Sequence, residues 1–133
     1  MTTIVTLTLN PAVDLSSEAD IVRHTQKTRT FNERMDPGGG GLNVARVAKR
    51  LGAEVTAVFL AGGVTGTVLD ALLERHRIDR VRIPAEGDTR MSLNVFERSS
   101  GKEYRFVPEG PEVRESEWTA CLDAAAAAEA DYL

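Results

Sequence analysis

The stretch that decides the fold is Pro37-Gly38-Gly39-Gly40-Gly41-Leu42-Asn43, followed by residues 44–61 with the sequence VARVAKRLGAEVTAVFLA. Apolar residues in this segment recur with the spacing of one helix face, at Val44, Val47, Ala48 and Leu51. Gly52 stands where a helix commonly ends, and residues 55–61 are a short apolar run typical of a buried strand. The stretch therefore predicts a glycine loop, a helix with those four residues on its buried face, and a strand of a parallel sheet.

Similar strand and helix patterns flank this unit. Residues 3–9 form another buried apolar run, which Asn10-Pro11 ends. Downstream come a helical pattern around residues 68–73 and a short strand at residues 80–83. The order strand, helix, strand, helix, strand predicts a parallel sheet with right-handed crossovers.

The C-terminal region continues this alternation. A third helix is expected to begin near Ser116, with a buried face made of Trp118, Cys121, Leu122 and Ala125. Residues 130–133 resemble the opening of a fourth parallel strand. Because a natural chain rarely stops where a buried strand begins, we expect this sequence to be part of a longer one.

Residues 89–96 alternate between apolar and polar side chains, which predicts a strand with one solvent-facing side. A turn at Ser99-Ser100-Gly101 separates them from a returning strand at residues 103–107. This hairpin does not continue the parallel sheet. We expect it to form, with part of residues 12–36, a small sheet over the main domain. The apolar members of the alternation are Met91, Leu93 and Val95.

The composition argues against several classes of protein. The chain has 133 residues, of which 42% are hydrophobic and 27% charged, the balance of one globular domain. Its formal net charge of −4 argues against nucleic acid or an anionic membrane as a partner, and no apolar run is long enough to span a bilayer. Cys121 is the only cysteine, which fits a reducing, cytoplasmic setting. His24 and His76 share no ligand spacing with Cys121, so no metal site is assigned.

The four glycines can carry chemistry because they leave the backbone bare. A ligand can lie against a main chain without Cβ atoms and contact its N–H groups, and the N-terminus of the following helix favours anionic or hydroxyl-rich ligands. Asn43, in the first turn of that helix, can both donate hydrogen bonds to a sugar hydroxyl and accept them. A flexible loop or a plain tight turn would have the same composition.

Two better-known glycine motifs are excluded by their spacing. A phosphate loop needs Lys and then Ser or Thr after its last glycine, where this chain has Leu42-Asn43. A dinucleotide fingerprint needs a third glycine at the sixth position, which is Asn43 counted from Gly38 and Val44 counted from Gly39. In addition, no strong strand is expected to run directly into the loop.

Charged residues give two further candidates. Asp14 follows the first strand, and ligands of open parallel sheets gather at the carboxyl ends of the strands. Its carboxylate can accept hydrogen bonds from two sugar hydroxyls, although a turn or cap residue would look the same. Arg90, on the polar side of its strand, can bind a phosphate with its two-pronged guanidinium, although an ordinary solvated arginine is the simpler interpretation. That simpler interpretation holds more strongly for Lys27, Arg29 and Arg105.

Together these segments resemble the PfkB, or ribokinase-like, family of sugar kinases. The resemblance covers essentially the whole chain in order and rests on Thr6-Leu-Thr-Leu-Asn-Pro-Ala-Val-Asp14, Pro37-Gly-Gly-Gly-Gly-Leu-Asn-Val-Ala-Arg46, Leu51-Gly52, Ala61-Gly-Gly-Val-Thr-Gly66, Thr89-Arg90 and Tyr104-Arg-Phe-Val107. It implies an α/β fold, with a three-layer α/β/α parallel sheet and a small β-sheet lid formed by segments 12–36 and 88–107. Residues 1–133 would be the N-terminal part of the kinase domain, without its C-terminal nucleotide-binding part.

The resemblance also implies roles for individual residues. Asp14, Asn43 and the glycines Gly38 and Gly39 would contact sugar hydroxyls, and Arg90 on the lid would meet the phosphate that the substrate already carries. Further phosphate contacts would come from Lys27 and Arg29, across a dimer interface formed by the lids, and more weakly from Arg105.

The activity implied is ATP-dependent phosphorylation of fructose 6-phosphate to fructose 1,6-bisphosphate, the phosphofructokinase step of glycolysis. The four glycines and Tyr104-Arg-Phe-Val107 resemble the minor, ribokinase-like type of 6-phosphofructokinase. Tagatose-6-phosphate kinase, fructose-1-phosphate kinase and a non-catalytic sugar-phosphate-binding module are the alternatives. ATP and Mg²⁺ would be bound mainly by the missing C-terminal part, which would also hold the catalytic residues. We therefore expect residues 1–133 to be inactive alone.

Overall fold

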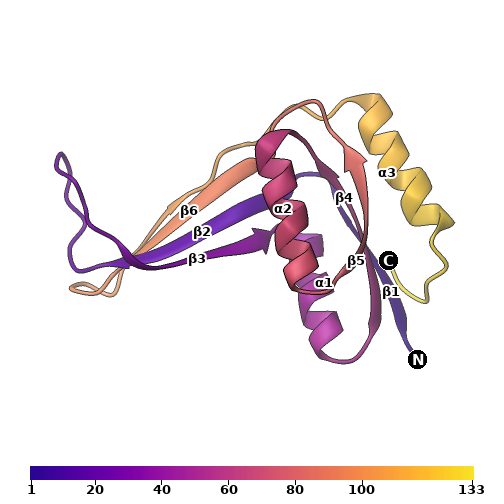
Figure 1. Cartoon of the computed structure of the whole chain (residues 1–133), viewed down its shortest axis with the longest axis horizontal. Coiled ribbons are helices and arrows are strands. Elements are labelled where there is room, and N and C mark those ends of the chain that lie inside the picture. The colour runs from indigo at the N-terminus through magenta and orange to yellow at the C-terminus, as the bar shows by residue number, and fades with distance from the viewer.

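The computed structural model describes all residues from Met1 to Leu133 and contains two sheets and three helices (Figure 1). The first sheet is parallel, with strand order β1-β4-β5, and consists of β1 (Thr3–Thr8), β4 (Glu54–Ala61) and β5 (Asp79–Pro84). The strands β1 and β4 are mostly apolar residues and threonine, as expected for strands covered on both faces, whereas the edge strand β5 carries Asp79, Arg80 and Arg82. The prediction of a parallel sheet is confirmed.

Helices cover both faces of this sheet. Figure 1 shows α1 (Gly40–Arg50) and α2 (Gly63–Arg75) on one side and α3 (Glu115–Ala127) on the other. The side chains of β4 alternate between two cores: Phe59 packs in the core under α1 and α2, whereas Val58 and Leu60 pack with Cys121 of α3. The three-layer α/β/α arrangement is thus confirmed.

The second sheet is the lid, with strand order β3-β2-β6-β7. Its strands are β2 (Ala12–Ala19), β3 (Phe31–Gly38), β6 (Arg90–Glu97) and β7 (Glu103–Phe106). The two central strands, β2 and β6, are parallel, and the two outer pairs are antiparallel. Figure 1 shows this sheet extending away from the helices, with the loop between β2 and β3 at its far end. Val13 of β2 belongs to the larger core, so the base of the lid is packed into the main domain.

One expectation about the glycine loop is wrong. The structure has a strand, β3, that ends at Gly38 and leads directly into α1. This strand belongs to the lid and not to the parallel sheet, so the loop still differs from a dinucleotide-binding turn. Its sequence, with a charged or polar residue at most positions, hid the strand from a periodicity argument.

Two predicted helix faces are only partly confirmed, because Ala48, Cys121 and Ala125 are buried as predicted and the other members are exposed. In α1 the buried residues are Leu42, Ala45 and Ala48, whereas Leu51 is 82% exposed; the other exposed members of the predicted face are Val44 and Val47. In α3 the buried residues are Glu117, Cys121 and Ala125. Trp118 and Leu122 of the predicted α3 face remain substantially exposed. The small side chains of Ala45 and Ala125 are buried between helix and sheet, whereas Val44, Val47 and Trp118 are exposed.

The chain ends beside its own first strand. Tyr132 forms an isolated parallel bridge with Ile4, and the backbone N–H of Val5 donates to the carbonyl of Tyr132 at 2.9 Å. Asp131 also accepts a hydrogen bond from the backbone N–H of Thr3 at 2.9 Å. Residues 131–133 thus lie where a fourth strand next to β1 would begin.

None of the three helices is long and apolar enough to cross a membrane.

Candidate functional site

The candidate site lies where the lid joins the main domain. Strand alternation places Asp14 on one face of the lid, and its partners across the sheet are Asp36 of β3 and Ser92 of β6. Arg90 pairs with Ala12, two residues from Asp14, and therefore stands on the same face. The β2, β3 and β6 strands thus bring Asp14 and Arg90, 76 positions apart in the numbering of the chain, to one polar surface.

The glycine loop forms the wall next to Asp14. Gly38 is buried against the Asp14 carboxylate, and any Cβ at Gly38 would overlap that carboxylate. Gly39 has a φ of 114°, where a side chain is strained, and a Cβ there would lie 2.9 Å from Thr8 Cγ2. Gly40, by contrast, has open space on its side-chain position. A Cβ at Gly41 would lie 2.8 Å from the carbonyl oxygen of Leu7, so three of the four glycines are required by close approach or backbone angle.

Asn43 lies on the same loop-to-helix segment. Its backbone N–H donates to the carbonyl of Gly39 at 2.9 Å, which closes the first turn of α1. Its side chain is exposed and makes no hydrogen bond within the chain. The amide is therefore available to a ligand that lies over the loop.

Asp14 is surrounded by charges of both signs. Burial raises the pKa of its carboxyl above the ordinary value, while the nearby Arg90 guanidinium works in the opposite direction. The carboxylate of Asp36 adds to the rise, and Arg105 and Arg46 lower it. One half-buried carboxylate therefore stands among three guanidinium groups, an arrangement that suits a ligand with both hydroxyls and a phosphate.

The Arg90 guanidinium is already engaged in this structure. Its Nη1 donates to the carbonyl of Pro108 and its Nη2 to the carbonyl of Asn10, both at 3.0 Å. Its Nε is buried and has no partner within the chain. Arg90 thus joins the loop after β1 to the segment after β7, and each Nη retains a second N–H for a ligand.

Sequence reasoning missed Arg46 of α1. Its Nη1 donates to the carbonyl of Pro37 at 3.1 Å, and its Nη2 lies 3.6 Å from Asp36 Oδ1. It therefore fixes the residue before Gly38 and holds the carboxylate that stands opposite Asp14. The signal that was available was its spacing, since Arg46 lies one helical turn after Asn43.

The remaining candidates do not all meet at this place. Arg105 of β7 pairs with Asn94 on the polar face of the lid and is close enough to act on the Asp14 charge. Lys27 and Arg29 are exposed in the loop between β2 and β3, at the far tip of the lid in Figure 1. Within one chain, the structure therefore brings Asp14, Gly38, Gly39, Asn43, Arg90 and Arg105 to one region and leaves Lys27 and Arg29 away from it.

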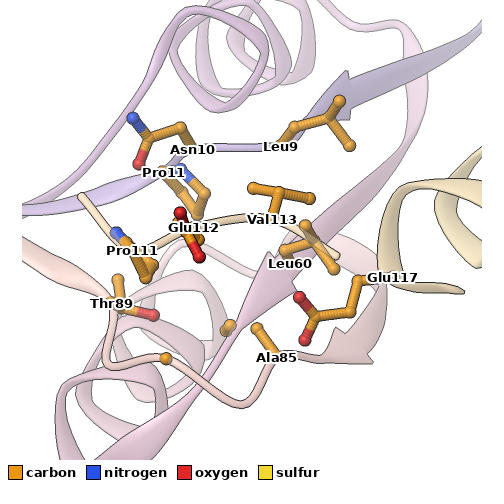
Figure 2. A pocket seen from close by; sticks show the side chains of 12 residues that line it. Leu9, Asn10, Pro11, Leu60, Ala85, Thr89, Pro111, Glu112, Val113 and Glu117 are labelled. Atoms are coloured by element: carbon orange, nitrogen blue, oxygen red, sulfur yellow. The ribbon is translucent and has the colours of Figure 1, made fainter. Parts of the chain in front are cut away.

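A small hollow next to the site has a structural role. Figure 2 shows it between the ends of β1 and β4 and the segment before α3, with Asn10, Pro11, Thr89 and Glu117 among its lining residues. Its volume of about 10 Å³ has room for one water molecule at most. Glu117 accepts hydrogen bonds from the backbone N–H groups of Arg114 and Glu86, at 2.9 and 2.8 Å, which lower the pKa of its carboxyl. The hollow is too small for a sugar.

Two features of a nucleotide or metal site are absent from the side chains of residues 1–133, a cluster of metal ligands and the lysine of a phosphate loop. The chain has no group of three or more His, Cys, Asp or Glu side chains that could hold a metal ion. The glycine loop also lacks the lysine of a phosphate loop.

The comparisons with known proteins agree with this fold. The pfkB family of carbohydrate kinases matches residues 7–133, and the chain belongs to that family. It is 48% identical over 120 residues to the ATP-dependent 6-phosphofructokinase isozyme 2 of Mycobacterium tuberculosis, covering 90% of this chain. The tagatose-6-phosphate kinase of Staphylococcus epidermidis is 34% identical over 116 residues, which cover 86% of this chain.

Solved structures give the same result. The crystal structure of Escherichia coli phosphofructokinase-2 in complex with fructose 6-phosphate superposes on 99% of this chain with a TM-score of 0.91 and 36% identity. The chain spans only part of these proteins: 35% of the M. tuberculosis protein, 37% of the S. epidermidis protein and 44% of the E. coli crystal chain.

Proposed function

We propose that residues 1–133 form the acceptor-binding part of a sugar-phosphate kinase whose substrate is fructose 6-phosphate and whose product is fructose 1,6-bisphosphate. The observation that carries this proposal is the packing of the Asp14 carboxylate against the bare backbone of Gly38, on the same face of the lid as Arg90. Such a site offers an acceptor for hydroxyls and a cation for a phosphate. The similarity to 6-phosphofructokinases supports the choice of substrate.

The roles follow from the chemistry of each group. Asp14, the Gly38-Gly39 backbone and the exposed amide of Asn43 bind sugar hydroxyls. Arg90 and Arg105 bind the phosphate of the substrate. Phosphoryl transfer depends chiefly on positioning and charge stabilisation, so a rigid acceptor site is a direct contribution to the rate. ATP would supply the phosphoryl group and Mg²⁺ would neutralise its charge. Both would be held mainly by parts of the full-length kinase outside these residues, and we place that kinase in the cytoplasm.

Lys27 and Arg29 complete the phosphate site of a partner subunit in this proposal. The lid has a second, apolar face, of which Met91 and Leu93 are 41% exposed and Phe106 is 60% exposed. Apolar surface on a thin sheet is stabilised when another copy covers it, and two lids packed through these faces form a homodimer. Light scattering of the full-length kinase should give a dimer at micromolar concentration, and Leu93→Asp should convert it to a monomer.

Other kinases of the family are the alternative. A tagatose-6-phosphate kinase is among the relatives, and fructose-1-phosphate kinases resemble this chain in outline but often carry Lys where this chain has Gly40. The space at Gly40 is open, so the chain could accommodate that lysine and does without it. A sugar-phosphate-binding module without activity is the alternative outside enzymes.

A coupled assay of the full-length kinase on the three sugar phosphates tests the proposed substrate against these alternatives. We expect kcat/KM for fructose 6-phosphate to exceed that for tagatose 6-phosphate and fructose 1-phosphate. A higher kcat/KM on either competitor would replace the proposed substrate, and no turnover with binding retained would favour the binding module. Residues 1–133 alone should show no turnover, because they contain no group placed to stabilise the transferring phosphoryl.

A further inference from the structure

The loop that carries Lys27 and Arg29 is tied to the rest of the lid by one side chain. Of the hydrogen bonds that residues 21–30 make outside the regular ladders, one reaches beyond the loop and its adjoining strands. In it the backbone N–H of Val22 donates to Oε2 of Glu97 at 2.6 Å. The other contacts stay local, such as the bond from the N–H of Arg23 to Thr28 Oγ1 at 3.0 Å.

Glu97 is an unusual residue for its position. It is the last residue of β6, and the alternation of that strand places it on the apolar face, after Met91, Leu93 and Val95. Only 7% of its surface is exposed, and it forms no ion pair. A carboxylate covered in this way is costly unless hydrogen bonds replace the lost water. An apolar residue would continue the pattern at no such cost.

Hydrogen bonds from two different segments satisfy the carboxylate. Oε1 accepts the hydroxyl of Ser100, in the turn between β6 and β7, while Oε2 accepts the N–H of Val22. These donors lower the pKa of the Glu97 carboxyl, so it is charged at neutral pH. The backbone also brings the segments together, because the N–H of Ser99 donates to the carbonyl of Asp20 at 3.1 Å. Glu97 therefore joins the β2–β3 loop to the β6–β7 turn.

A second contact braces the base of the same loop without reaching its tip. Glu18 of β2 accepts hydrogen bonds from Asn32 at 2.6 Å and from Arg98 at 3.1 Å. The Arg98 guanidinium also lies over the ring of Phe31, 4.6 Å from its centre. These contacts hold the end of β2 against the start of β3. They do not involve residues 21–30, whose hydrogen bond to the rest of the lid is the one to Glu97.

We propose that Glu97 is a positioning residue for the phosphate-binding loop, which it holds through Val22 so that Lys27 and Arg29 reach the substrate phosphate of the partner subunit. This inference rests on the proposed function, in which those two cations bind phosphate. It explains why a covered carboxylate stands on the apolar face of β6.

The test uses the full-length kinase with Glu97→Ala, Glu97→Val and Glu97→Gln. Losing the acceptor in Ala or Val should raise KM for fructose 6-phosphate about tenfold, on the scale of one hydrogen bond to a charged group. KM for ATP should stay unchanged and kcat should stay within about twofold, because the loop acts on binding. Gln keeps a carbonyl oxygen for Val22 and should restore most of the affinity. Val suits the apolar face, so it serves if the Ala variant fails to fold.

Two readouts separate positioning from a general loss of structure. Backbone amides of residues 20–30 should exchange hydrogen faster in the Ala variant while those of β4 do not. The matched control is Glu54→Ala, which removes an exposed carboxylate far from the lid and should leave KM unchanged. Unchanged KM in both Glu97→Ala and Glu97→Val, or a Gln variant as impaired as they are, would overturn the positioning role.

Lys27→Ala and Arg29→Ala distinguish failure of this inference from failure of the proposed function. If both leave KM for fructose 6-phosphate unchanged, the loop does not bind phosphate, and both the proposed role of the loop and that of Glu97 fall. If they raise KM and the Glu97 variants do not, only the inference about Glu97 falls. If Glu97 acts through the loop, the double variant Glu97→Ala, Lys27→Ala should raise KM for fructose 6-phosphate by less than the product of the two single fold-changes.

Discussion

The parallel sheet and the lid are two sheets built from one chain under opposite constraints. Each face of the parallel sheet is covered by helices, and Phe59 of β4 is fully buried there. The lid is a single layer, with Asp14 and Arg90 on one face and Phe106, which is 60% exposed, on the other side. The parallel sheet obtains its stability from burial, whereas the lid exposes charged side chains on one face and apolar side chains on the other.

The residues that form the larger core and the charged residues around the candidate site also lie in different parts of the chain. The larger core contains residues from α1, α2, β4 and a single lid residue, Val13. The lid contributes three of the charged residues around the candidate site: Asp14, Arg90 and Arg105. Changes in the parallel sheet should therefore alter stability first, and changes in the lid should alter binding first.

The largest expected effect is a loss of stability in the parallel sheet. Phe59→Ala should lower the free energy of unfolding by about 3–5 kcal/mol, because a fully buried ring leaves a cavity. Phe106→Ala in the lid should cost less than about 1 kcal/mol in the monomer, since most of that ring is already in water. Urea unfolding of both variants measures the difference. Equal costs, independent of protein concentration, would contradict the division between the two sheets.

The second prediction concerns the junction of the two sheets at the glycine loop. Gly38→Val should weaken binding of fructose 6-phosphate by a factor of about 100 or more and destabilise the fold by about 1–3 kcal/mol, because its side chain would displace the Asp14 carboxylate. Gly39→Val should also affect the fold, since Gly39 has a positive φ and contacts Thr8.

The matched control within the same loop is Gly40→Ala. Nothing lies near its side-chain position, and alanine favours the helix that begins there. This variant should bind normally and gain roughly 0.4–1 kcal/mol of stability. If Gly38→Val and Gly40→Ala bind equally well, the bare backbone at Gly38 has no role in recognition.

Much of the parallel sheet could be predicted from the sequence, because short apolar runs separated by helical patterns are compatible with few other folds. The sequence could not predict which face of each helix is buried. Leu42, Ala45 and Ala48 recur every three residues, and Val44, Val47 and Leu51 recur after three and four, so both sets fit the period of a helix and periodicity allowed either to be buried. In α3, Glu117 is buried because backbone N–H groups of Arg114 and Glu86 satisfy it, and the contact with Glu86 spans 31 positions.

For the candidate site, the sequence predicted individual residues but not the contacts between them. Asp14 could be placed by the rule that ligands gather at strand ends, and Gly38 by its lack of a side chain. Neither rule indicates that the two touch, because the contact depends on the pairing of β2 with β3. The role of Arg46 was missed for the same reason, since its partner Asp36 is brought to it by that strand pair.

The third prediction tests the charge on the lid. Arg90→Ala should weaken binding of fructose 6-phosphate by about 1.5–3 kcal/mol, the scale of charge-assisted hydrogen bonds. Arg90→Lys should recover only part of this, because a lysine cannot span the carbonyls of Pro108 and Asn10 while it binds phosphate. Arg50→Ala removes an exposed arginine at the end of α1 and serves as control. An unchanged KM for fructose 6-phosphate in Arg90→Ala would remove Arg90 from the site.

The smallest expected effect on stability is at Asp14, where removing the charge should stabilise the folded chain. Burial raises the pKa of this carboxyl above its ordinary value of 3.8, and Arg90 only partly opposes the rise. A raised pKa means that the folded chain binds this proton more readily than the unfolded chain does. The stability it contributes is therefore fully present below the ordinary pKa and is lost as the pH rises through the folded pKa.

At neutral pH the ionised Asp14 should thus cost stability, so Asp14→Asn should unfold at a slightly higher urea concentration than the unmodified protein. The gain should shrink as the pH is lowered towards 4, because Asp14 itself takes up a proton as the pH falls through its raised pKa. Affinity for the sugar phosphate should nevertheless fall about tenfold, because an amide cannot accept two hydroxyl bonds as a carboxylate does. Urea titrations at both pH values, with binding measured at neutral pH, decide the matter. An Asn variant less stable at neutral pH would mean that the attraction of Arg90, Arg105 and Arg46 for the carboxylate outweighs its burial, so that Asp14 serves the fold as well as the ligand.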